Sequence, residues 1–372
     1  MSKLEELIEE LCPDGVEYRP LENCCNVLDR QRKPVTKAAR ESGEYPYYGA
    51  NGIQDYVSDY IFDGTFVLVG EDGSVVTEIG TPVVNWAEGQ IWVNNHAHII
   101  EEIAGVKLRY LYHYLQTVNV APLIHGNIPK LTGGDFKALS IPIPPLPVQE
   151  EIVRILDNFT DLTAELQAEL QARAKQYEYY KHYLFDNAKK AKEVTLDRIA
   201  ENCDNQRKPI TSGQREAGEY PYYGASGIVD YVKDYIYDGD YLLISEDGAN
   251  LVARNTPIAF SITGKNWVNN HAHVLKFDNY YTRRYVEMYL NSIDLTPFIS
   301  GAAQPKLNQK NLNRIPISLP SMDEQKKIVD MLDKFDVLSA DINTGLPAEI
   351  EARQKQYEYY RNKLLTFKEL GA

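Results

Sequence analysis

Two stretches of the chain carry apolar residues at every third or fourth position, which is the spacing of an amphipathic helix. In residues 147–192 this spacing runs from Ile152 through Leu166 to Leu184, and Pro147 suits a first helical turn, where a missing backbone N–H costs nothing. A helix of this length would extend on the order of 60 Å, too long to pack within one small domain. We therefore expect a spacer helix that pairs with a second helix of the same chain.

The second periodic stretch, residues 321–372, begins with Ser321 and Glu324 at the spacing of a capping box. Its period is interrupted near 343–347, where Gly345 and Pro347 disfavour helix. We predict a second spacer helix that is broken at this point.

Residues 1–146 and 193–320 have a different pattern, in which β-branched and aromatic residues lie between glycine and aspartate turns. The segments YPYYGA, YIFDGTFVLVGEDG and YIYDGDYLLISEDG are of this kind. We expect EDG to be a hairpin turn with glycine at a positive-φ position, and the tyrosines of YPYYGA to lie in the core. The predicted fold class is α+β, with two similar strand-rich domains, each followed by a long helix.

The two halves of the chain are copies of each other, displaced by 175 residues. QRKPVTKAARESGEYPYYGANGIQDYVSDYIFDG from Gln31 returns as QRKPITSGQREAGEYPYYGASGIVDYVKDYIYDG from Gln206, and 29 of the 43 positions through the following EDG agree. The same displacement relates WVNNHAH at Trp92 to its copy at Trp267. This agreement indicates an internal duplication, so one architecture is expected twice.

Length and composition fit this organisation. The 372 residues suit two domains of about 150 residues each, and the 44% hydrophobic and 25% charged residues are typical of a globular protein. Apolar runs are far shorter than the roughly 20 residues of a membrane span, and the acidic start does not resemble a signal peptide, so we expect a soluble, cytoplasmic protein. The four cysteines form no CxxC pair, which favours buried thiols over disulfides or a zinc site.

The formal net charge of −14 argues against a protein that binds nucleic acid through bulk positive charge. The charge is uneven, because residues 1–146 carry a net −9 and residues 193–320 only −2. Any contact with DNA must come from local basic clusters, or a partner must supply part of the affinity.

The order of motifs along the chain resembles that of the specificity subunits of type I restriction-modification systems. These motifs are CPDGVEYRPL, then GANG, EDG and NNHAH, a loop HGNIPKL or SGAAQPKL, the segment IPIPPLPVQEEIV, and a helix that ends in KQYEYYKHYL. The resemblance covers nearly the whole chain. It implies that each strand-rich domain is a target-recognition domain that recognises one half of a split site in double-stranded DNA, and that the helices pair as an antiparallel coiled coil.

The same resemblance implies the partners and their cofactors. Two modification subunits would dock on the helices and supply S-adenosylmethionine for adenine N6 methylation, and restriction subunits would add translocation and cleavage with ATP and Mg. The chain itself would need no cofactor and would have no catalytic residues. In agreement, the sequence contains neither GxGxxG after a strand nor GxxxxGK[ST]. Two alternatives stay open, a metal-dependent nuclease or hydrolase and a two-domain adaptor without a DNA role.

One dense basic cluster lies in each domain, ahead of a proline that stiffens the loop. Arginine can pair with guanine and glutamine with adenine, whereas lysine usually contacts phosphate. We predict DNA contact for these residues, with a solvated surface loop as the alternative. They are Gln31, Arg32, Lys33, Gln206, Arg207 and Lys208.

The repeated NNHAH segments offer amides and imidazoles that either face the DNA groove or tie neighbouring loops together. The HxH spacing, completed by Glu71-Asp72 or Glu246-Asp247, also fits a metal site on one face of a strand, but a third ligand with diagnostic spacing is missing, so we predict no metal. The candidates are Asn94, Asn95, His96, His98, Asn269, Asn270, His271 and His273.

Further candidates lie in the loops before the helices and on the helices themselves. Lys130, Gln304 and Lys306 belong to glycine-containing loops that can approach a DNA backbone closely, unless these loops only link domain to helix.

Tyrosines of the repeated KQYEYY suit an interface with one wet edge, either as a docking surface for partner subunits or as a seal between the helices. These tyrosines are Tyr177, Tyr180, Tyr357 and Tyr360.

Two features bear on the DNA site as a whole. The domains are alike through their first halves but diverge between 74–90 and 249–265 without a change of length, so we expect related, non-identical half-sites arranged as an imperfect inverted repeat. In the first helix, TAEL at Thr163 is followed by QAEL at Gln167. This tandem unit is a little longer than one helical turn, and we predict that it sets the spacing of the half-sites.

Overall fold

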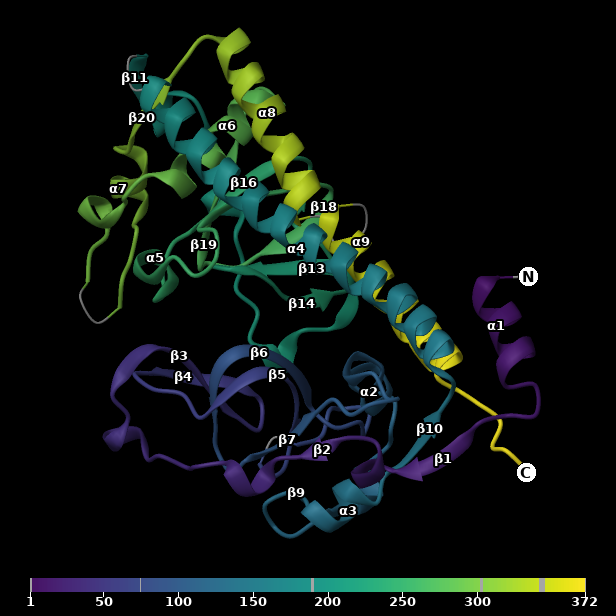
Figure 1. Cartoon of the computed structure of the whole chain (residues 1–372). Helices are drawn as coiled ribbons and strands as arrows, with labels where there is room; N and C mark the ends of the chain where they lie inside the picture. Colours follow the sequence, from purple (N-terminus) through teal and green to yellow (C-terminus); the bar gives the residue numbers. More distant parts are fainter. Residues whose placement is uncertain (1, 74, 189–190, 302–303, 341–344, 372) are drawn as a thin grey trace. The chain divides into compact units, whose positions relative to one another are not determined.

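The computed structural model forms two compact units that repeat one order of elements (Figure 1). Unit 1 comprises Met1–Gln167 and Glu349–Ala372, and unit 2 comprises Ala168–Ala348. The limits of the four parts predicted from the sequence, at 146, 192 and 320, stay predictions. The structure describes residues 2–73, 75–188, 191–301, 304–340 and 345–371.

Unit 1 is built on a six-stranded sheet in the order β2-β7-β5-β6-β3-β4. All pairs are antiparallel except β3 with β6. Strand β5 alternates as expected for a strand with two covered faces, with Val67 and Val69 in the core beneath α2 and Phe66 and Leu68 in a second cluster on the other face. The strands are β1 (Glu17–Pro20), β2 (Asn26–Val27), β3 (Ser42–Gly49), β4 (Gly52–Val57), β5 (Phe62–Gly70), β6 (Val84–Val93), β7 (Ala97–Glu101), β8 (Ile124–His125), β9 (Lys130–Leu131) and β10 (Ser140–Ile143). The α-helices that belong wholly to the first 145 residues are α1 (Lys3–Leu11), α2 (Leu108–Leu115) and α3 (Gly133–Lys137).

Unit 2 has the same plan, with its main sheet divided into two four-stranded sheets, β12-β19-β16-β17 and β14-β13-β18-β15. The division arises because the strand equivalent to β6 is present as β17 and β18, and the strand equivalent to β5 as β15 and β16. The strands are β11 (Lys192–Thr195), β12 (Glu201–Asn202), β13 (Ala217–Gly224), β14 (Gly227–Val232), β15 (Tyr237–Asp238), β16 (Tyr241–Ser245), β17 (Ala259–Ile262), β18 (Lys265–Val268), β19 (Ala272–Lys276) and β20 (Pro316–Leu319). The shorter helices are α5 (Asn250–Ala253), α6 (Tyr280–Ser292) and α7 (Gln309–Asn313).

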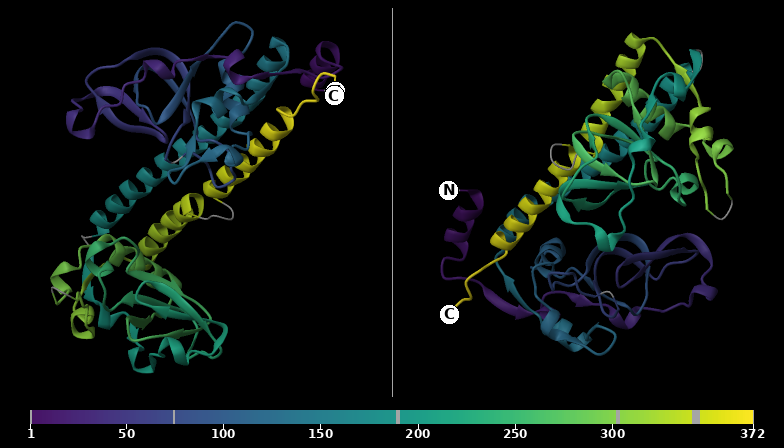
Figure 2. Two further views of the ribbon diagram at one scale, coloured as in Figure 1. Left: turned by 90° about the horizontal axis from the view of Figure 1, so that it is seen from below. Right: turned by 180° about the vertical axis from the view of Figure 1, so that it is seen from behind.

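The spacer helices pair within each unit. Helix α4 (Leu146–Ala188) is one uninterrupted helix of 43 residues. Its first part runs antiparallel to α9 (Leu346–Leu364) in unit 1, where Phe159 stacks on Tyr360 with ring centroids 5.4 Å apart, and its later part packs on α8 (Met322–Ala340) in unit 2 (Figure 2). The predicted antiparallel pairing and the capping box at Ser321 are confirmed. The predicted break lies between α8 and α9, and its residues 343 and 344 lie outside the described residues.

Two predictions that were made from the composition can be compared with the structure. In the described residues no helix is both long enough and apolar enough to cross a membrane. The four cysteines are buried and free, as expected. Burial raises the pKa of the Cys25 thiol to about 12, so this thiol stays protonated and unreactive at neutral pH.

Candidate nucleic-acid interface

Four motifs that lie far apart in the sequence meet at one end of the sheet in unit 1. The backbone N–H of Glu71 donates to the carbonyl of His96 at 2.8 Å, and that of Leu131 donates to the carbonyl of Glu71 at 2.8 Å. The N–H of Lys33 donates to the carbonyl of Val93 at 3.3 Å. Unit 2 repeats these bonds at residues 175 or 176 positions further on. The converging segments are 29–33, 71–73, 93–98 and 129–131, together with 204–208, 246–248, 268–273 and 305–307.

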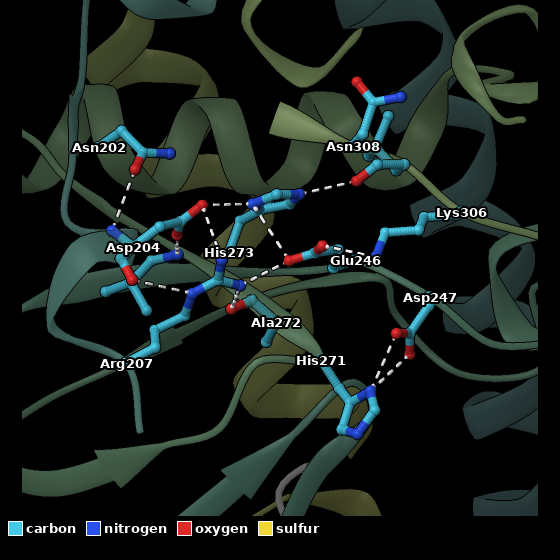
Figure 3. A network of polar contacts seen from close by, with 12 residues as sticks. Asn202, Asp204, Arg207, Glu246, Asp247, His271, Ala272, His273, Lys306 and Asn308 are labelled. Atoms are coloured by element: carbon cyan, nitrogen blue, oxygen red, sulfur yellow. Dashed lines mark hydrogen bonds and ion pairs between the residues drawn. The ribbon is translucent and has the colours of Figure 1, made fainter. Parts of the chain in front are cut away.

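The arginine of the basic cluster lies at the centre of this convergence. The Arg32 side chain is only 11% exposed, and its Nη1 donates to the Glu71 carboxylate and to the carbonyl of Ala97, both at 2.6 Å. In unit 2, Arg207 donates to Glu246 at 2.6 Å and to the carbonyl of Ala272 at 2.8 Å (Figure 3). The guanidinium groups therefore hold the loops together in both units.

A buried histidine completes the cluster. The Nδ1 of His98 lies 2.6 Å from the Asp29 carboxylate, and its Nε2 lies 3.0 Å from the carbonyl of Leu131. Both ring nitrogens of His98 therefore have an oxygen partner within hydrogen-bond distance. His273 lies in the same way between Asp204 and the carbonyl of Leu307. Burial raises the pKa of Asp29, but the hydrogen bond and charge of His98 outweigh it and hold that pKa below its usual value.

The carboxylates of this network are paired with basic side chains. Ligand atoms of Asp29, Glu71 and His98 lie within 4.8 Å of one another, which is close enough for a metal site. However, Glu71 is bound by Arg32 at 2.6 Å and by the Nζ of Lys130 at 3.1 Å. The two histidines of HxH also face different carboxylates, since His96 pairs with Asp72 and His98 with Asp29. The geometry thus favours an ion-pair network over the hydrolase alternative.

The predicted contact residues divide by exposure. The buried or largely buried ones make contacts that tie the loops together. This role was left open for the asparagines and histidines, whereas the two arginines were expected either to contact DNA or to lie in a solvated loop. To contact DNA, all of these side chains would have to leave their partners. They are Arg32, Asn94, His98, Arg207, Asn269 and His273. The accessible ones surround the network and stay predicted DNA contacts. They are Gln31, Lys33, Asn95, His96, Lys130, Gln206, Lys208, Asn270, His271, Gln304 and Lys306.

The sequence interpretation missed two partners and misjudged a turn. Asp29 and Asp204 each precede the cluster arginine by three residues and recur at the 175-residue displacement, which is a signal that could have found them. The positive φ of Gly73, 82°, is confirmed, but EDG is not a hairpin turn. Strand β5 ends at Gly70 and β6 begins at Val84, so EDG opens a longer connection and pairs with the loop of Lys130.

The tyrosines of the two helices also differ in their exposure to solvent. Tyr357 is buried, and its hydroxyl lies 3.0 Å from the Nδ1 of His113, while Tyr177 and Tyr180 pack on Phe335. These contacts are those of residues that seal the helix pairs. The exposed members of the repeat are Tyr179, Tyr359 and Tyr360, and Tyr179 and Tyr359 are the most exposed, at 64% and 61% against 39% for Tyr360.

Two copies of a strand-rich domain with converging polar loops, each joined to part of an antiparallel helix pair, define a protein with one architecture duplicated within a single chain. The model of the type I restriction modification DNA specificity domain matches the chain twice, over residues 13–176 and 188–352. The chain belongs to this family, and it is a specificity subunit of the type I class.

Individual relatives agree with this assignment. A putative type I restriction enzyme specificity subunit of Haemophilus influenzae is 36% identical over 392 aligned positions, which cover 98% of both chains. A type I restriction enzyme specificity subunit of Escherichia coli is 32% identical over 70% of this chain and 71% of its own. Among solved structures, an S subunit of a type I restriction-modification system from M. genitalium has the same fold, with a TM-score of 0.61, 19% identity, and coverage of 94% of this chain and 96% of its own.

Proposed function

We propose that the protein reads a two-part site in double-stranded DNA, one half with each unit, and directs the methylation and restriction that partner subunits perform. The observation that carries this proposal is the duplicated loop cluster, in which accessible Gln, Lys, Asn and His side chains surround one ion-pair network. Such side chains supply both base-edge and phosphate contacts. The network keeps the loops in place before DNA arrives, which lowers the entropic cost of binding.

Catalysis is assigned to the partners. The carboxylates of the loop cluster are engaged by arginine, histidine and lysine, so none of those described is positioned as a free general acid or base. S-adenosylmethionine, ATP and Mg then belong to two modification subunits and to restriction subunits, which meet this chain and its DNA in the cytoplasm. The negative net charge of this chain fits a protein whose DNA affinity is completed by such partners.

The exposed tyrosines are the proposed docking points of the modification subunits. Tyr179 and Tyr359 occupy the same place in the two copies of KQYEYY, and each lies on a helix within a different unit. A surface that occurs twice suits a partner that binds in two copies. Tyr→Ala at both positions should reduce co-purification of the modification subunit, whereas Tyr→Phe should preserve it. Unchanged co-purification of the double Ala variant would show that docking occurs elsewhere.

The function is tested by comparing DNA binding with and without the partner. The purified chain should bind DNA weakly at physiological salt, and its complex with modification subunits tightly, with a methylation motif split into two halves. Lys33→Ala combined with Lys208→Ala should weaken binding to all sequences and reduce the salt dependence by about two ions. A complex that methylates DNA without a split motif would refute the proposal. Tight specific binding by the chain alone would refute the need for a partner.

A further inference from the structure

In the connection that follows Glu-Asp-Gly, one short segment differs at every position between the two units. Residues 75–80, VVTEIG, and 250–255, NLVARN, do not share a residue at any position. Their flanks do agree, because Glu-Asp-Gly precedes each segment by one further residue and Thr-Pro follows it. We call these two segments the variable loops. They are equal in length, so the difference is one of side chains and conformation and not of an insertion.

In unit 1 the variable loop is a small hairpin-like turn. Thr77 donates its N–H to the carbonyl of Thr81 at 2.8 Å, and Val83 donates to the carbonyl of Val75 at 3.0 Å. Val75 is buried and anchors the loop, whereas Ile79 at its tip is 72% exposed. Because this apolar side chain is so highly exposed at the turn, it does not contribute to the core.

In unit 2 the same position holds the single helical turn α5. Asn250 closes the turn, because its side chain accepts from the N–H of Thr256 at 3.0 Å and donates to the carbonyl of Thr256 at 2.9 Å. Arg254 adopts a left-handed φ of 54° and donates to the carbonyl of Ile293 at 3.0 Å. Leu251 is the buried anchor, and Val252 is 56% exposed.

Both variable loops are attached to the candidate DNA interface in the same way. The N–H of Gly73 donates to the carbonyl of Pro129 at 3.0 Å, and that of Gly248 to the carbonyl of Pro305 at 3.2 Å. The next residues of those neighbouring segments are Lys130 and Lys306, which reach Glu71 and Glu246. The ion-pair network therefore places each variable loop beside an accessible lysine.

We infer that the variable loops read bases and that their difference makes the two half-sites differ. This inference rests on the proposed function and names the segment that gives each unit its own specificity. A partner that binds in two copies meets equivalent surfaces in the two units, so a loop that differs at every position does not suit it. Two DNA half-sites, in contrast, are free to differ. Ile79 and Val252 supply the kind of apolar contact that recognises a thymine methyl group.

A segment exchange tests the inference in the complete complex. Residues 75–80 are replaced by NLVARN in one variant, and residues 250–255 by VVTEIG in the other. The carbonyls of Leu290 and Ile293 that hold Arg254 correspond in sequence to those of Leu115 and Val118 in unit 1. Methylome sequencing should show that each variant changes only the half-site of the exchanged unit, toward the sequence read by the other unit.

Point variants keep the test valid if an exchanged loop fails to fold. Ile79→Ala and Val252→Ala alter exposed side chains, and each should relax one position of its own half-site by about tenfold in relative methylation. Thr117→Ser, outside the variable loops, serves as a control that leaves both half-sites unchanged. An unchanged motif in all four variants would overturn the inference. A parent complex without a split motif would instead refute the proposed function, so the two failures are distinguishable.

Discussion

Replacing Arg32 by alanine separates its predicted role, DNA contact, from the positioning of the loops that its contacts in the structure indicate. In the structure the guanidinium binds Glu71, the carbonyl of Ala97 and the carbonyl of Asp29, the last at 2.8 Å through Nε. Hydrogen bonds that involve a charged group contribute about 1.5–3 kcal/mol each, and a buried acceptor left without a partner adds a desolvation cost. Glu71 keeps Lys130 as a second partner, which reduces the penalty. We therefore expect a loss of about 2–3 kcal/mol in the free energy of unfolding of unit 1.

Urea unfolding of the full chain, combined with methylome sequencing of the complex, measures both consequences. If Arg32 positions the loops, Arg32→Ala lowers the stability of unit 1 and weakens methylation through the first half-site at all of its positions together. If Arg32 also reads a base, one position of that half-site is relaxed by about 1–3 kcal/mol more than the others. Arg207→Ala should do the same to unit 2 and the second half-site.

Lys33→Ala is the matched control, because it removes the neighbouring positive charge from an exposed side chain and should change stability by less than about 0.5 kcal/mol. An Arg32→Ala protein with wild-type unfolding and one relaxed base would refute the positioning role.

Three further predictions concern pH, the half-sites and the helix. Burial lowers the pKa of His113, although Asp157 opposes this shift. The unfolded chain therefore binds more protons than the folded chain, so the free energy of unfolding should fall as pH drops below about 6.5. His113→Gln should flatten this dependence in urea unfolding between about pH 7 and 5. A variant with the same pH slope as wild type would contradict that assignment. The methylome motif should be an imperfect inverted repeat, and wholly unrelated halves would exclude this expectation. A third four-residue unit inserted after Leu170 should add about 6 Å to α4 and lengthen the unread gap by one or two base pairs, whereas an unchanged gap with full activity would show that α4 does not set the spacing.

The sequence was sufficient for the architecture because its main signals are local or repeated. The helix period identified α4, whose residues Ile152 and Leu166 are buried as predicted, and the duplication required two similar units. The expectation for the YPYYGA tyrosines is confirmed in part, since Tyr47, Tyr48 and Tyr222 are buried, whereas the remaining tyrosines, Tyr45, Tyr220 and Tyr223, are only partly buried. These features depend on periodicity and composition, which can be read without knowing any long-range contact.

The arrangement of the candidate site could not be predicted, because it depends on which segments meet. Gln-Arg-Lys was predicted to contact DNA, with a solvated surface loop as the alternative, but the arginine turns inward to Glu71, 39 residues away, while Lys33 stays exposed. The indole N–H of Trp92 fixes this loop by donating to the carbonyl of Lys33 at 2.7 Å. Adjacent residues of one polar motif thus have opposite exposure, and composition alone does not distinguish them.

The ion-pair network also explains why the variable loops can differ between the two copies. A loss of about 2–3 kcal/mol is a large fraction of the roughly 5–15 kcal/mol that stabilises a domain, so changes at Arg32, Glu71 or their copies are strongly constrained. The variable loops make no such contact with the network through their side chains. Each needs only one buried anchor, Val75 or Leu251, and a backbone attachment through the preceding glycine. Sequence change there alters the surface offered to DNA at little cost in stability, so two copies of one scaffold can acquire different half-sites while both still fold.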